Sequence, residues 1–314
     1  MSKSLEKLSA EPVLFAKEES VKRLRNSYNI QSPNNVDFDT KTRISNWIDG
    51  SASDWIFRLP NMDSYDIIIS DNLIDILKVR SDAWISGSFF WHKALIGCSA
   101  EIIHKSEELL LRNKPRIITS SMFSSSYLKN SAIQYEVGLF GTSSQIATNK
   151  NRRNSALISC GQGSDKSLIR LVLEFIEKII HYDSVPFEFV WVDPIVFPFN
   201  KAPSWMKMAD YTADMYKSIS AAIIRPGIGT VTDSLTFGAR LFMYYELNNL
   251  EMLENAKKIE SLNLGEIFYD IENAWISSME YICDDSLKFD HENNLKSIEV
   301  NGADQAARII LNEY

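Results

Sequence analysis

Residues 222–246 read AIIRPGIGTVTDSLTFGARLFMYYE, and this stretch decides the fold. An apolar run at 221–224 ends at the turn-forming RPGIG of residues 225–229, and a second apolar run covers 241–245. Short apolar runs bounded by glycine and proline are typical of buried strands in α/β proteins. The stretch therefore predicts a buried strand, a glycine turn, a helix and a second strand.

The helix between the two predicted strands carries signals at both ends. Thr230 is placed to act as the N-cap, and Asp233 follows three residues later, close to the capping-box pattern. Gly238 is suited to end the helix. A helix N-terminus behind a glycine turn presents backbone N–H groups to an anion, and glycine lets that anion approach closely. We expect a phosphate-bearing ligand here, and the alternative is an unliganded turn of the kind common in α/β proteins.

A second glycine turn occurs earlier in the chain. The predicted strand 156–160 leads into GQGSD at residues 161–165, and an amphipathic helix is predicted over 168–181. Strands that alternate with helices form a parallel sheet, whose ligands bind beyond the carboxyl ends of the strands. Both glycine turns fall at such ends, which strengthens the expectation of an anion site.

The chain is long enough for two domains, because 314 residues exceed the size at which a single core usually stops growing. The polar segment 141–154 has no apolar period and is the best candidate for a linker. We predict an N-terminal domain at 1–145, a C-terminal domain at 150–300, and a helix within 301–314 that packs back on the N-terminal domain. Further strands are expected at 66–70, 83–88, 116–119, 134–138 and 187–192, and further helices at 99–112 and 211–219.

Composition excludes several classes of protein. A net charge of −8 argues against a nucleic-acid binder, which usually has a basic excess. The three cysteines lack metal-ligand spacing and are expected to be reduced, mostly buried thiols. The N-terminal segment has no apolar signal region, and no run of eighteen apolar residues occurs. We expect a cytoplasmic protein that makes at most peripheral contact with the inner face of the membrane.

Two motifs resemble the donor-binding half of GT-B glycosyltransferases, in particular the MurG-type N-acetylglucosaminyltransferases. Residues 225–233 are similar to the family segment R-x-G-x-x-T-x-x-E, with Asp233 in place of the final glutamate. Residues 251–256 are similar to E-Q-x-x-N-A, with Met252 in place of the glutamine. The resemblance covers residues 150–314 well and residues 60–140 loosely. It implies an α/β protein of two Rossmann-like domains that binds a nucleotide sugar, expected to be a UDP-sugar, without a cofactor.

The resemblance also implies roles for individual residues. Arg225 would lie against the diphosphate or the base, and Asp233 would accept hydrogen bonds from the ribose hydroxyls, with helix capping as the alternative. In relatives the glutamine replaced here by Met252 contacts the donor sugar, whereas Asn255 is better interpreted as a packing residue. The expected donor-binding residues are Gly161, Gly163, Ser164, Arg225, Gly227, Gly229, Thr230, Asp233 and Glu251.

The N-terminal half departs from the family. MurG-type enzymes begin with a strand and a G-x-G-H loop, and residues 1–60 contain no such loop. Either this domain is abbreviated or a partner chain completes it.

An inverting transfer needs a base, for which His92 and Asp71 are candidates because both follow predicted strands. For His92 the alternative is a packed residue beside aromatic rings. Ser88 and Trp91 would line the acceptor pocket.

A D-x-D motif at Asp37 and Asp39 raises the alternative of a metal site of the GT-A kind. No apolar strand precedes it, so we interpret it as a solvated loop and predict no metal.

The function expected is sugar transfer from a nucleotide diphosphate sugar to an unknown acceptor, which could be lipid-linked, by metal-independent inversion. The alternatives are a nucleotide-sugar hydrolase of related fold and a non-catalytic or split-enzyme subunit.

Overall fold

The computed structural model describes residues 1–15, 56–57, 59–94, 96–141, 146, 154–161, 166–245 and 249–313. The chain forms two compact units, one of Met1–Phe140 with Asn301–Tyr314 and the other of Gly141–Val300. Within the described helices, no stretch combines the length and apolar character that crossing a membrane requires. Asp37, Asp39, Gly163 and Ser164 lie outside the described residues.

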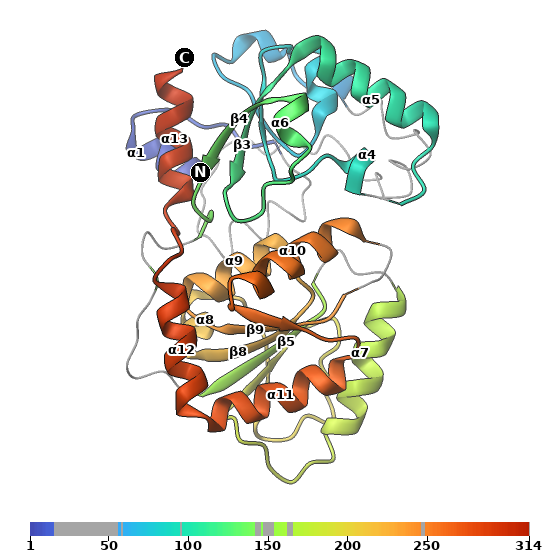
Figure 1. The fold of residues 1–314 in the computed structure, drawn as a ribbon, viewed down its shortest axis with the longest axis vertical. Coiled ribbons are helices and arrows are strands. Elements are labelled where there is room, and N and C mark those ends of the chain that lie inside the picture. Colours follow the sequence, from blue (N-terminus) through green and yellow to red (C-terminus); the bar gives the residue numbers. More distant parts are fainter. Residues whose placement is uncertain are drawn as a thin grey trace. The chain divides into compact units, whose positions relative to one another are not determined.

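The first unit is built on a four-stranded parallel sheet whose order follows the sequence, β1-β2-β3-β4 (Figure 1). Its strands are β1 (Ile69–Asp71), β2 (Trp84–Ser86), β3 (Arg116–Ser120) and β4 (Ile133–Val137). The helical segments are α1 (Ser2–Lys7), η2 (Met62–Ser64), η3 (Ile74–Lys78), α4 (Trp91–Ala94), α5 (Ala100–Asn113), α6 (Leu128–Ser131) and α13 (Gly302–Asn312). The predicted strands and the predicted helix at 99–112 are confirmed to within a few residues.

Helix α13 closes one face of this sheet although it lies at the far end of the sequence. Ala306 and Ile310 are buried in one apolar cluster with Trp84, Ile118 and Val137 of the sheet. At its start the Gly138 amide donates to Gln305 Oε1 at 2.7 Å. This close approach depends on Gly302, because a Cβ there would overlap the carbonyl oxygen of Gly138.

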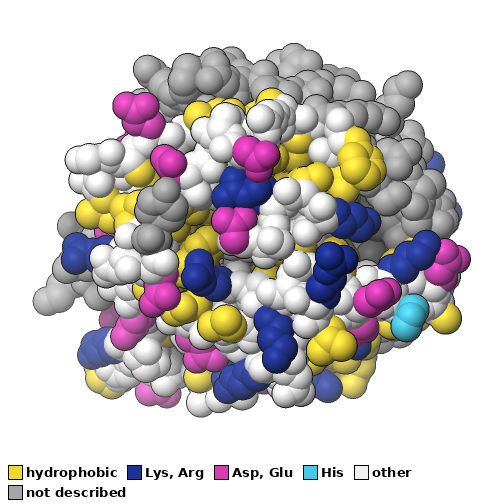
Figure 2. All heavy atoms as spheres, turned by 90° about the horizontal axis from the view of Figure 1, so that it is seen from above, with side chains coloured by type: hydrophobic (Ala, Val, Ile, Leu, Met, Phe, Trp, Pro, Cys, Tyr) yellow, Lys and Arg dark blue, Asp and Glu magenta, His cyan; other side chains and the backbone are white. Residues whose placement is uncertain are grey.

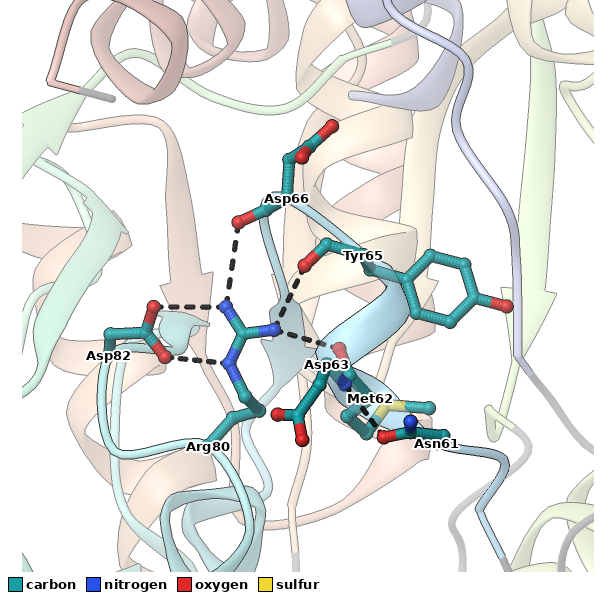
Figure 3. Close-up of polar contacts among 7 residues, drawn as sticks. All are labelled: Asn61, Met62, Asp63, Tyr65, Asp66, Arg80 and Asp82. Carbon is teal, nitrogen blue, oxygen red and sulfur yellow. Dashed lines mark hydrogen bonds and ion pairs between the residues drawn. The ribbon is translucent and has the colours of Figure 1, made fainter.

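Arg80 fixes the segment that leads into β1 (Figure 3). Its guanidinium donates to the carbonyl oxygens of Met62 at 2.7 Å and Tyr65 at 2.9 Å. It also forms a two-point ion pair with Asp82 at 2.8 and 2.9 Å, which lowers the pKa of that carboxyl. The planar fork of arginine suits this geometry, so residues 61–66 are held against the turn before β2.

One face of the protein is mixed in charge (Figure 2). On the face shown in Figure 2, basic and acidic side chains are interspersed with apolar ones over the described residues. Such interspersion lacks the single-sign field that a nucleic-acid surface uses.

The second unit is a six-stranded parallel sheet in the order β10-β9-β8-β5-β6-β7. The strands are β5 (Ser155–Ser159), β6 (Val190–Val192), β7 (Met206–Met208), β8 (Ile219–Ile224), β9 (Arg240–Met243) and β10 (Gly265–Ile267). Its helices are α7 (Lys166–Ile179), α8 (Ala213–Ser218), α9 (Ile228–Thr236), α10 (Leu250–Ser261), α11 (Ile271–Cys283) and α12 (Asp285–Leu295). Every residue of β5 and β8 is buried, which is why both strands are apolar apart from serines.

Helices cover both faces of this sheet (Figure 1). Helices α7 and α11 pack on one face in a shared apolar core that includes Val172 and Trp275, and α9 and α10 lie on the other. The predicted elements of this half are confirmed, as is Gly238, whose φ of +82° follows the end of α9. The predicted N-cap is wrong: α9 begins three residues earlier than expected, with Gly227 as its N-cap.

Substitution of Gly302 by alanine should destabilise the first unit. The added Cβ has no room beside the Gly138 carbonyl, and overpacking of this kind costs about 1–3 kcal/mol. Urea denaturation of wild type and Gly302→Ala would measure this cost. Gly229→Ala is the matched control, because a Cβ at Gly229 meets nothing within 4 Å. Equal stability of Gly302→Ala and wild type would contradict the close approach.

Candidate functional site

The candidate site lies where the strand order of the second unit reverses. From β5 the chain adds β6 and β7 on one side, and from β8 it adds β9 and β10 on the other. Ser159 and Ile224 are register partners at the carboxyl ends of β5 and β8, so the two glycine turns leave the sheet side by side. Crevices at such reversals are where open α/β sheets bind ligands. The structure thus brings together two turns that are over sixty residues apart in the sequence.

The turn after β8 presents the N-terminus of α9. Gly227 is the N-cap, and no side chain of the described residues caps the first turn. The first intrahelical bond is donated by Val231, so the amides of Ile228, Gly229 and Thr230 precede the helical ladder. A Cβ added at Gly227 or Gly229 would meet nothing within 4 Å, which shows open space in front of the turn. These amides and the helix dipole suit an anion.

Helix α10 holds this turn in place. The buried side-chain amide of Asn255 donates to the carbonyl oxygen of Pro226 at 3.0 Å, as its interpretation as a packing residue predicted. Asn249 caps α10 by accepting from the amide of Met252 at 3.2 Å. Met252 is buried, whereas Glu251 in the first turn of α10 is partly exposed.

Asp233 lies in the second turn of α9 and is 9% exposed. In a capping box the acidic residue stands three positions after the N-cap. Since the N-cap is Gly227, that position belongs to Thr230, and the capping interpretation of Asp233 is wrong. A buried carboxylate one turn behind the amides of Ile228, Gly229 and Thr230 is compatible with the predicted contact to a ribose.

The turn after β5 begins at Gly161, whose φ of +73° is one that glycine adopts without strain. Next to it is a polar cluster that no sequence motif identified, formed by the buried Ser159, Cys160 and Asp193 and the half-buried Tyr211. Asp193 follows the predicted strand 187–192, so its place at the carboxyl end of a parallel strand could have identified it. Burial and the Asp193 charge raise the pKa of Cys160 to about 12, so this thiol is not a nucleophile at neutral pH.

Of the three free cysteines only Cys160 is buried, since Cys98 is half-buried and Cys283 exposed. The expectation of mostly buried thiols was therefore wrong. Among the residues that the structure describes, no group of three or more His, Cys, Asp or Glu side chains could hold a metal ion.

In the first unit, Asp71 and Ser88 lie at the carboxyl edge of the sheet. Asp71 is the last residue of β1 and pairs in register with Ser86 of β2, two residues before Ser88. Asp71 is exposed by surface area, yet protein atoms surround its carboxyl closely enough that desolvation raises its pKa. A raised pKa brings a carboxylate closer to the strength that a general base needs.

The side chain of His92 is buried by packing rather than exposed at the surface. Its side chain is 3% exposed, its Nε2 lies 3.0 Å from Glu107 Oε1, and its ring stacks on Phe90. Burial lowers the pKa of His92, and the hydrogen bond to Glu107 only partly opposes this. Trp91 is partly exposed and contacts Phe89 edge to face at 4.9 Å between ring centroids. This geometry favours the alternative of a packed histidine.

The burial of His92 should appear in the pH dependence of stability. Because the pKa of His92 is lower in the folded chain, the unfolded chain takes up the proton first, and stability falls as the pH drops below about 6.5. Thermal unfolding of wild type and His92→Gln between about pH 8 and pH 5 would test this. The wild type should lose more stability on acidification than the variant, and parallel profiles would contradict the expectation.

No protein-family model matches the sequence, and no curated protein matches it. Solved structures match nearly its full length. The glycosyltransferase SnogD from Streptomyces nogalater has a TM-score of 0.61 at 9% identity, covering 99% of this chain and 94% of SnogD. Arabidopsis thaliana UGT89C1 complexed with UDP has a TM-score of 0.63 at 11% identity, covering 99% and 94%. The spinosyn rhamnosyltransferase SpnG complexed with thymidine diphosphate has a TM-score of 0.58 at 11% identity, covering 96% and 93%.

The structural similarity establishes the fold, and at identities this low it leaves the activity open. The chain consists of two Rossmann-like α/β domains, each on a parallel sheet, and has the fold of GT-B glycosyltransferases. This confirms the fold class expected from the sequence.

Proposed function

We propose that this protein transfers a sugar from a nucleoside diphosphate sugar to an acceptor. The observation that carries the proposal is that both glycine turns begin side by side where the strand order of a GT-B fold reverses. One of these turns contains the R-x-G-x-x-T-x-x-D pattern of residues 225–233. Structures of similar fold were solved with UDP and with thymidine diphosphate, which supports a nucleoside diphosphate as the ligand.

The roles of the residues follow from their positions. The amides of Ile228, Gly229 and Thr230 and the guanidinium of Arg225 stabilise the diphosphate as it leaves with the bond electrons. Gly227, whose own amide donates to the Arg225 carbonyl oxygen at 2.8 Å, contributes the open space that the diphosphate occupies. Asp233 accepts hydrogen bonds from the ribose, and Gly161 admits the donor close to the backbone. Gly163, Ser164 and Glu251 complete the donor site in this proposal.

Acceptor activation is assigned to the first unit. Asp71 takes the proton from the acceptor hydroxyl in a direct, inverting displacement, because it lies at the sheet edge with a raised pKa. His92 is the second candidate base. Ser88 and Trp91 contact the acceptor. The proposal also includes a closer relation to MurG-type enzymes and a cytoplasmic location. It further includes metal-independent chemistry and an N-acetylhexosamine as the sugar.

Nucleotide binding is the first test. UDP, GDP, CDP, dTDP and ADP are each added to the protein with and without Mg²⁺, and thermal midpoints are recorded. A ligand at a hundred times its Kd adds about 2.7 kcal/mol, which raises the midpoint by about 5–10 °C for a domain of this size. A selective shift, equal with and without Mg²⁺, is expected. No shift with any nucleotide would contradict the donor site.

Two variants locate the bound nucleotide. Loss of hydrogen bonds to a charged group costs about 1.5–3 kcal/mol, so Asp233→Ala should weaken binding about 10- to 100-fold. Gly229→Ala adds a methyl group to the open space before α9 and should weaken diphosphate binding without lowering stability. Wild-type affinity in both variants would place the nucleotide elsewhere. Release of free sugar from UDP-sugars without an acceptor would favour the hydrolase alternative.

A further inference from the structure

A buried carboxylate lies under the turn after β5. Asp193 is 3% exposed and follows β6 directly. Its Oδ2 accepts from the Ser159 hydroxyl at 2.9 Å and lies 3.7 Å from Cys160 Sγ, while its Oδ1 accepts from the amide of Ile195 at 3.2 Å. Both oxygens are thus engaged by donors on three different residues. A buried carboxylate is costly unless it is paired in this way.

The Ser159 hydroxyl has its full set of hydrogen bonds. A hydroxyl has one proton to donate and two lone pairs to accept with. The proton goes to Asp193, and the lone pairs face the amide of Gly161 at 3.3 Å and the Tyr211 hydroxyl at 3.0 Å. Because the carboxylate only accepts, it fixes the direction of the Ser159 proton and hence the lone pair that holds Gly161.

The main chain of Ser159 reaches the other glycine turn. Its carbonyl oxygen accepts from the amide of Arg225 at 3.3 Å and from the Tyr244 hydroxyl at 3.0 Å. Arg225 begins the turn that leads into α9, and Tyr244 follows β9. One residue therefore connects the first residues of both turns: its carbonyl oxygen holds Arg225, and its hydroxyl, which Asp193 orients, holds Gly161.

We propose that Asp193 is a positioning residue that, through the Ser159 hydroxyl, holds Gly161 beside Arg225 in the geometry that receives the diphosphate of the donor. This inference rests on the proposed function and adds to it a residue that touches neither sugar nor nucleotide. A network that served only to stabilise the sheet end would be replaceable by apolar packing at little cost. A network that sets the direction of the Gly161 amide is not replaceable in this way.

The test compares Asp193→Asn and Ser159→Ala with Ser218→Ala. Asparagine has one acceptor oxygen and one donor NH₂ group, so it leaves either Ser159 or Ile195 without an acceptor. Ser218 is the matched control, since its hydroxyl accepts from Trp191 Nε1 at 3.1 Å at the opposite end of β8. Titration calorimetry is carried out with the nucleoside diphosphate that binds the wild type and with the corresponding nucleoside.

The expected result is a loss of about 10-fold or more in diphosphate affinity for Asp193→Asn and Ser159→Ala, with nucleoside affinity unchanged. The double variant should be no weaker than the weaker single variant, because both act through one network. Ser218→Ala should bind as the wild type does. If Asp193→Asn does not fold, Ser159→Ala and Tyr211→Phe decide the question in the same assay.

The outcomes distinguish a failure of the positioning role of Asp193 from a failure of the proposed function. The positioning role alone is overturned if the folded variants bind the diphosphate as tightly as the wild type. It is also overturned if their affinities for the nucleoside and for the diphosphate fall equally. A wild type that binds none of the nucleotides overturns the proposed function, and the positioning role with it.

Discussion

The pairing of β5 with β8 is the constraint on which the rest of the second unit depends. These strands are separated by α7, β6, β7 and α8 in the sequence, yet they are neighbours at the centre of the sheet. Their register places Ser159 beside Ile224, so the glycine turns begin at the same level. A shift of one residue would turn the side chain of Ser159 to the opposite face and disconnect it from Asp193.

Around this pair the structure combines an apolar interior with polar groups at one edge. The strands are buried on both faces by helices, which leaves their backbone polar groups bonded within the sheet. Where the strands end, that bonding stops, and Ser159, Asp193 and Asn255 supply hydrogen bonds to the turns instead. The same edge presents the amides of the first turn of α9, so these amides and the side chains that support the turns lie at one edge of the sheet.

The sequence predicted those features that are set locally. Continuous apolar runs identified the buried strands, and Gly238 marked the end of α9 because few other residues adopt its positive φ. The start of α9 was mispredicted because threonine and glycine are about equally favoured as N-caps, and Gly227, with its extended backbone, is the residue that holds this position. Asp193 was overlooked because its partner Ser159 is thirty-four residues away and only the sheet brings them together.

By itself the sequence determined the strands and helices that flank the two glycine turns, most of the strands of the first unit, and which turn carries a motif similar to donor-binding segments. Hydrophobic periodicity and glycine placement suffice for this because they act over a few residues. Only the tertiary structure decided that β5 lies against β8, that Asp193 orients Ser159, and that His92 is packed against Phe90 and Glu107. Strand order and burial result from packing between segments that are distant in the chain, and no local pattern specifies such packing.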